Sequence, residues 1–162
     1  MSIFFDIETT GLNPYTDSIL TIQFKKGTEL TVWKLWETPE VEILLKFLDY
    51  LKPISFDVTI YGYNCLKFDI PFLVARLNHY NLLNADVYKL IYDKKWLDLY
   101  QYKGDNYMSM DRWLDSYGIK RSCPYSGRNM PLFYENEMYQ EIEEHAIDDL
   151  NMCEQFVQAL EL

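Results

Sequence analysis

The chain has 162 residues, of which 49% are hydrophobic and 17% aromatic, and this composition excludes an intrinsically disordered protein. Its formal net charge is −10, from 15 basic and 25 acidic side chains, which disfavours a protein that binds nucleic acid through an extended basic surface. The same charge is compatible with an enzyme that holds divalent cations, because bound metal ions reverse the local sign of charge.

The first part of the chain predicts a three-stranded meander over residues 2–36. Residues 2–6 are aliphatic or aromatic as far as the first acidic position, and residues 20–24 alternate between apolar and polar side chains, as in a half-buried strand. A turn at residues 10–14 contains Gly and Asn-Pro, and the third strand is centred on residues 30–32.

Helices and strands alternate in the rest of the chain. Thr38 and Pro39 predict a helix start, as cap and first-turn residue, and Pro53 predicts its end. The later predicted elements are a strand at 58–61, a helix from about Ile70, a strand at 97–100, a helix at 109–117, a loop at 120–133 and a helix from about Glu135 to the end. A meander followed by β-α-β crossovers predicts one mixed sheet with helices packed on it.

The cysteines and the apolar runs bear on the cellular environment. Cys65, Cys123 and Cys153 have no zinc-site spacing and leave an odd count for disulfides, so we expect a reducing cytoplasm. Only five residues precede Asp6, too few for a signal-peptide core, and no apolar run approaches the roughly 18 to 20 residues of a membrane span. We therefore expect no membrane association.

Asp6 and Glu8 lie in the first predicted strand, within "FFDIETTGLNP". Residues two apart on a strand point to the same side, so both carboxylates face one way. Like charges at about 4 Å repel by roughly 1 kcal/mol in water and by several-fold more near protein. Two interpretations remain open: the strand frays into solvent, or a divalent cation lies between the carboxylates.

Two further acidic positions follow at the start of one helix and inside another. Asp69 opens the second helix, where it fits either a helix cap or a site at the carboxyl end of the fourth strand. His145 and Asp149 are four residues apart and share a helix face, either as a surface pair or as part of a site. Asp149 falls on the apolar stripe of this helix, whereas Asp148 is rotated off it and is expected to be solvated.

Three stretches, "FFDIETTGL", "NCLKFDIPFL" and "HAIDDL", in this order resemble the three motifs of the DnaQ-like (DEDD) 3′–5′ exonuclease superfamily. The resemblance covers residues 3 to about 157. The second motif is similar to that of family B polymerase proofreading domains and of the YprB-like group. The resemblance as a whole implies an RNase H-like α/β fold with a mixed five-stranded sheet flanked by helices, forming a single exonuclease domain over residues 1–162. Members carry a tyrosine four residues before the last aspartate or a histidine five before it, so His145 occupies the register of the tyrosine.

The resemblance implies a two-metal site. Two Mg²⁺ or Mn²⁺ ions would be held by Asp6, Glu8, Asp69 and Asp149, and His145 would orient or deprotonate the attacking water. It also implies that Thr9 and Thr10 contact the terminal sugar, that Leu12 packs on the last base, and that Asn64 and Phe68 support the strand end. Basic residues of the later loops, among them Arg121 and Arg128, are either a grip for a short single strand or solvated charges.

The expected function is 3′–5′ hydrolysis of single-stranded nucleic acid, with DNA favoured as substrate and nucleoside 5′-monophosphates as products. Two alternatives remain open: an exoribonuclease that trims RNA or degrades oligonucleotides with the same site, and a catalytically weak subunit that binds nucleic acid. A separate polymerase or helicase is a further candidate partner, because no such domain fits in this chain.

Overall fold

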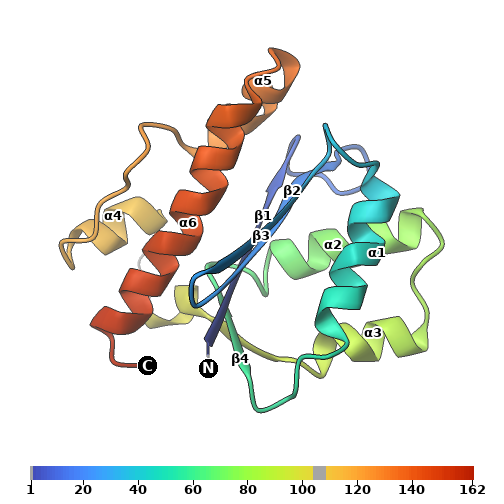
Figure 1. Cartoon of the computed structure of the whole chain (residues 1–162), viewed down its shortest axis with the longest axis horizontal. Coiled ribbons are helices and arrows are strands. Elements are labelled where there is room, and N and C mark those ends of the chain that lie inside the picture. The colour runs from blue at the N-terminus through green and yellow to red at the C-terminus, as the bar shows by residue number, and fades with distance from the viewer. Residues whose placement is uncertain (1, 104–108) are drawn as a thin grey trace.

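In a computed structural model that describes residues 2–103 and 109–162, the chain forms a central five-stranded sheet with helices on both faces (Figure 1). The strands are β1 Ser2–Thr9, β2 Ile19–Lys26, β3 Glu29–Lys34, β4 Thr59–Gly62 and β5 Lys95–Asp98. The α-helices are α1 Glu40–Leu51, α2 Asp69–His79, α3 Ala85–Tyr92, α4 Met110–Asp115, α5 Met130–Glu135 and α6 Tyr139–Ala159. Two short 3₁₀-helices, η1 Leu99–Lys103 and η2 Gly127–Asn129, complete the described elements.

The sheet has the order β3-β2-β1-β4-β5, and its two halves differ in direction. The meander β1-β2-β3 is antiparallel, whereas β4 and β5 are added in parallel to β1 through helical crossovers. The predicted mixed five-stranded sheet flanked by helices is thus confirmed. The result of this order is that β1, which carries the first acidic motif, lies at the centre of the sheet.

Each face of the sheet has its own apolar core. Helices α1, α2 and α3 cover one face, where Phe5, Phe24 and Phe47 are fully buried, and α4 and α6 cover the other, where Phe156 packs on Trp113 (Figure 1). Ion pairs fix α6 across the sheet, from Lys25 to Glu154 at 2.6 Å and from Lys34 to Glu143 at 2.8 Å. These pairs tie the long last helix to β2 and β3, while α6 also packs on the central strand β1.

Several predicted boundaries were wrong, for local reasons. Thr38 does not cap α1, whose first residue, Glu40, follows Pro39, and the fifth strand ends at Asp98 where η1 takes over. The expected loop at 120–133 contains η2 and α5, and α6 begins at Tyr139 rather than at Glu135. These segments have no regular apolar period, so hydrophobic spacing could not place them.

Helix α3 was not predicted at all. Val87, Leu90 and Ile91 recur at helical spacing and pack on the core, but α3 has only eight residues and Ile91 alone is fully buried, so its apolar stripe is short. A second signal is Asn84, whose side chain accepts a hydrogen bond from the backbone N–H of Val87 at 2.9 Å and caps the helix. None of the helices described is both long and apolar enough to cross a membrane.

Candidate active site

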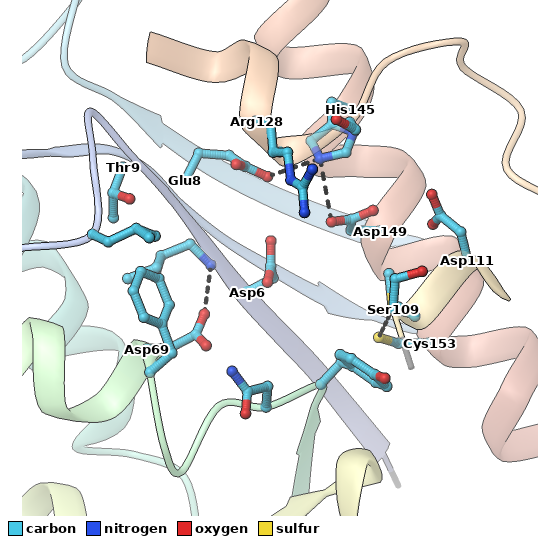
Figure 2. Close-up of a pocket in the computed structure, with 18 of the residues that line it drawn as sticks. Asp6, Glu8, Thr9, Asp69, Ser109, Asp111, Arg128, His145, Asp149 and Cys153 are labelled. Carbon is cyan, nitrogen blue, oxygen red and sulfur yellow. Dashed lines mark hydrogen bonds and ion pairs between the residues drawn. The ribbon is translucent and has the colours of Figure 1, made fainter. Parts of the chain in front are cut away.

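The first two carboxylates lie on the α6 side of β1. Alternation along the strand turns Ile7 into the core on the other face, while Asp6 and Glu8 point into a cleft (Figure 2). The side-chain amide of Gln23, opposite Asp6 on β2, donates to Asp6 Oδ2 at 2.7 Å. Glu8 is only 6% exposed and β1 continues through Thr9, so the interpretation that this strand frays into solvent was wrong.

Asp69 reaches the same cleft from the start of α2. Its Oδ1 accepts a hydrogen bond from the backbone N–H of Ile7 at 3.2 Å (Figure 2), so the side chain is tied to β1 and does not cap its own helix. The register explains this contact: β1 pairs with β4 only as far as Phe4, and the Ile7 amide lies beyond that pairing. The interpretation of Asp69 as a helix cap was therefore wrong. Its side chain is 3% exposed and lies beside β1, as expected for a residue of a site.

His145 and Asp149 enter the cleft from α6, one helical turn apart. His145 Nε2 lies 3.6 Å from Glu8 Oε1 and 3.5 Å from Asp149 Oδ2 (Figure 2). The three groups offer ligand atoms that all lie within 4.8 Å of one another. The histidine that stands in the tyrosine register therefore does reach the acidic cluster.

Asp148 corrects one expectation. It is 5% exposed, and its carboxylate accepts hydrogen bonds from the backbone N–H groups of Ser122 (3.0 and 3.1 Å) and Cys123 (3.3 Å). The solvated neighbour predicted from the helical wheel is thus an anchor for the chain before η2. A helical wheel shows only which side of α6 a residue occupies, and it cannot show that a loop 25 residues away covers that side.

Arg121 lies inside the cluster, although its sequence context suggested either a loop residue that grips the substrate strand or a solvated charge. Its Nη1 is 2.5 Å from Asp149 Oδ1, and its Nη2 is 2.7 Å from Asp111 Oδ1. Nη1 also lies 2.9 Å from Nδ1 of His145. Because the guanidinium is occupied by protein carboxylates, Arg121 organises the site and is not available as a free phosphate grip.

The expected substrate-binding residues fall into two groups. One cleft of about 940 Å³ is lined by all five expected catalytic residues and by Thr9, Leu12, Asn64 and Phe68. Thr10 does not line it: its hydroxyl accepts a hydrogen bond from the Ser18 backbone N–H at 2.8 Å and closes the turn. Leu12 is 83% exposed at the mouth, in a position to touch a bound molecule.

Sequence reasoning missed Asp98, which positions one wall of the cleft. Its carboxylate accepts hydrogen bonds from the backbone N–H groups of Asn64 (2.7 Å), Leu66 (3.1 Å) and Tyr100 (2.9 Å). These bonds hold Asn64 in a left-handed conformation with φ of 60°. The available signal was an acidic residue at the carboxyl end of a short parallel strand, where sites in α/β sheets gather.

Mutual repulsion shapes the protonation of the cluster. Burial, followed by the charges of Asp69 and Glu8, raises the pKa of Asp6 well above its usual value. Burial likewise raises the pKa of Glu8, with Asp149 and Asp69 adding to the effect, and raises the pKa of Asp69 to about 7. Burial also lowers the pKa of His145; the Asp149 charge opposes this effect, and the Arg121 charge adds to it. Burial and mutual repulsion therefore both disfavour the charged form of these carboxylates.

These residues fit divalent cations. Four carboxylates on one cleft supply the oxygen ligands that Mg²⁺ and Mn²⁺ prefer. Their mutual repulsion is the kind that a bound cation relieves. Asp6, Glu8, Asp69 and Asp149 are the residues that would hold the ions.

A family model described as the RNase H superfamily matches residues 3–160 of the chain. The chain belongs to the RNase H superfamily. The RNase H-like fold inferred from the three sequence motifs is thereby confirmed, and superfamily membership together with the carboxylate-lined cleft supports a nuclease.

Comparison with solved structures shows where else this RNase H-like fold occurs. The family B DNA polymerase from the hyperthermophilic archaeon Pyrobaculum calidifontis matches 98% of this chain with a TM-score of 0.78 at 20% sequence identity. The match covers 24% of the polymerase chain, so this RNase H-superfamily chain spans about a quarter of that protein's length. Comparison with curated protein sequences gives no significant match.

Proposed function

We propose that this chain is a single-domain, metal-dependent 3′–5′ exonuclease over residues 1–162, acting on single-stranded nucleic acid and favouring DNA. The observation that carries the proposal is the convergence of Asp6, Glu8, Asp69 and Asp149 in one cleft. They come from β1, α2 and α6, which are far apart in the sequence. The three exonuclease-like motifs supply these residues, so motif and geometry agree.

The chemistry follows from the residues that face the cleft. When bound there, divalent cations would make a water molecule easier to ionise and neutralise charge on the phosphate. The four carboxylates would hold the ions, and His145 would orient the attacking water from the α6 side. Thr9, Leu12, Asn64 and Phe68, which all line the cleft, would contact the terminal nucleotide. Hydrolysis on this plan releases a nucleoside 5′-monophosphate.

An assay of strand polarity tests the proposal. With Mg²⁺ or Mn²⁺, the protein is expected to shorten 5′-labelled single-stranded DNA from its 3′ end, and EDTA is expected to stop the reaction. The same assay on RNA of the same sequence compares the two substrates, because recognition of the 2′-OH depends on the shape of the pocket. A polymerase or helicase partner stays a prediction.

Two controls separate the outcomes. An oligonucleotide with a blocked 3′ terminus should resist shortening, and equal shortening of the blocked strand would contradict 3′–5′ polarity. A preparation of the Asp6→Asn variant tests for contaminating nuclease. Binding of both strands without any shortening would favour the alternative of a catalytically weak binding subunit.

Arg128 is the residue that we expect to draw the substrate phosphate into this acidic cleft. Arg128 lines the same cleft as His145, Figure 2 shows its side chain directed towards the carboxylates, and no hydrogen bond or ion pair joins that side chain to another described residue. A charge-assisted hydrogen bond contributes about 1.5 to 3 kcal/mol. We therefore expect Arg128→Gln to raise KM by roughly 10- to 100-fold while kcat changes much less.

The matched control for Arg128→Gln is Lys46→Gln. Lys46 is exposed on α1, which covers the other face of the sheet, and its substitution removes one positive charge at a distance from the cleft (Figure 1). Steady-state kinetics on single-stranded DNA at a fixed ionic strength compares the two variants. Equal changes in KM would mean that net charge alone matters, and that Arg128 makes no specific contact.

A further inference from the structure

We propose that Arg121 is a positioning residue that holds His145 as the tautomer with its proton on Nε2. His145 then acts on the attacking water as a hydrogen-bond donor and not as its base. The catalytic half of this inference rests on the proposed exonuclease function, whereas the tautomer itself does not.

Arg121 faces His145 with a group that can only donate. Its Nε and Nη2 donate to Asp111 Oδ1 at 3.1 and 2.7 Å, and its Nη1 lies 2.5 Å from Asp149 Oδ1. The same Nη1 is 2.9 Å from His145 Nδ1. A guanidinium has five N–H donors and no acceptor, so Nδ1 must be the acceptor in this contact.

The consequence for the imidazole is a fixed proton position. A ring whose Nδ1 accepts a hydrogen bond carries its proton on Nε2 in the neutral form, and the doubly protonated ring would set two N–H groups against each other. A flipped ring would replace Nδ1 by a carbon against Arg121 and Nε2 by a carbon against the carboxylates. The hydrogen bond to Arg121 thus selects both the tautomer and the orientation.

Cys123 is the other neighbour of Nδ1, and it agrees with this assignment. Its Sγ lies 3.7 Å from Nδ1 and 3.9 Å from Arg121 Nη1. A thiol is a weak donor and a weak acceptor, whereas the guanidinium is charged and nearer. The Arg121 contact therefore decides the role of Nδ1.

The opposite edge of the ring faces carboxylate oxygen atoms. Nε2 is 3.5 Å from Asp149 Oδ2 and 3.6 Å from Glu8 Oε1, and the side chain is 2% exposed. Both distances exceed a good direct hydrogen bond, which suits an N–H that donates to a water bonded to either carboxylate. A protonated Nε2 cannot ligate a metal ion, so His145 does not complete a three-ligand site with Glu8 and Asp149.

Nitrogen NMR tests the tautomer without any assay of activity. The chain has two histidines, and His79→Gln removes the signal of the other one. In protein labelled with ¹⁵N-histidine and held with Mg²⁺, we expect His145 to show an unprotonated Nδ1 and a protonated Nε2. A protonated Nδ1 would overturn the proposal, whether or not the protein proves to be an exonuclease.

Two substitutions of His145 separate a donor from a base. The amide of Gln can donate a hydrogen bond from near the position of Nε2, but it has no proton affinity near neutral pH, whereas Ala does neither. We expect His145→Ala to lower kcat by roughly 10²-fold. The kcat of His145→Gln should stay within about tenfold of the wild-type value, which corresponds to at most about 1.4 kcal/mol of lost transition-state stabilisation. Equal losses in the two variants would overturn the donor role.

A double-mutant cycle tests whether Arg121 acts through His145. Arg121→Met is expected to lower kcat by roughly tenfold with KM nearly unchanged, and to cause little further loss in the His145→Ala background. Additive losses would mean that Arg121 acts through Asp149 instead, which would overturn the positioning role. Circular dichroism on each variant checks folding, and the NMR measurement on wild-type protein stands if Arg121→Met does not fold.

Discussion

Asp6→Asn is expected to abolish turnover and, in the absence of metal, to raise the melting temperature. Asp6 faces the charges of Asp69, Glu8 and Asp149. Loss of one carboxylate ligand removes charge stabilisation of several kcal/mol, so we expect kcat to fall by at least about 10³-fold. The neutral amide relieves repulsion, and each kcal/mol gained would raise the melting temperature by roughly 2 to 4 °C.

The structure lets Asn replace Asp6 with little change in shape. Gln23 donates to Asp6 Oδ2, and the oxygen of an Asn side chain can accept the same bond. Asp49→Asn on α1 is the matched control, since Asp49 is exposed and pairs only with Lys52 among the described residues. A large loss of stability in Asp6→Asn without metal would mean that Asp6 is a structural residue.

The burial of these carboxylates predicts how pH acts on the metal-free protein. Burial raises the pKa of Asp69 to about 7, so between about pH 4 and pH 7 the native state binds protons that the unfolded chain has released. The free energy of unfolding of metal-free protein should therefore decrease as pH rises through this window. Added Mg²⁺ competes with these protons, so it should raise the melting temperature more at about pH 8 than at about pH 6, and less in Asp6→Asn.

Local sequence patterns marked the four carboxylates as candidates, and the resemblance to the exonuclease motifs implied that they form one site. Asp6 and Glu8 follow from the period of a strand, and Asp149 follows from the apolar stripe of α6. The order of elements then predicted which strands and helices would meet. In the structure all four line one cleft.

The features that sequence reasoning missed depend on contacts between distant segments. Asp148 binds a loop 25 and 26 residues away, and Arg121 reaches Asp149 from that loop. Neither pairing leaves a trace in local periodicity, since the segment before η2 has none. The role of His145 depends on which of its nitrogens meets Arg121, and only the folded arrangement decides that.

A buried ion pair outside the acidic cluster holds the connection between β1 and β2, which carries Leu12. Arg76 on α2 donates to both oxygens of Glu40, at 2.9 and 2.7 Å, and its Nη1 donates to the Pro14 carbonyl at 3.1 Å. Glu40 also accepts a hydrogen bond from the Ile19 backbone N–H at 2.9 Å. The pair therefore anchors Pro14 and Ile19, which both lie on the C-terminal side of Leu12 in the connection between β1 and β2.

Arg76→Met is expected to destabilise the protein by about 3 to 5 kcal/mol, because it leaves Glu40 as an uncompensated buried charge. At roughly 2 to 4 °C per kcal/mol, the melting temperature should fall by about 6 to 20 °C. The loosened turn should also raise KM for single-stranded DNA, since Leu12 would lose its fixed position. Urea denaturation and steady-state kinetics on the same preparation measure the two effects.

The double variant Arg76→Met with Glu40→Gln decides whether buried charge is the cause. The amide introduced by Glu40→Gln can still accept the Ile19 N–H bond but carries no charge, so the double variant should be more stable than Arg76→Met alone. Lys52→Met, which breaks the exposed pair with Asp49, should lower the free energy of unfolding by no more than about 1 kcal/mol. If the double variant loses as much stability as the two single losses added together, Glu40 and Arg76 contribute separately, and the pair does not anchor the turn as a unit.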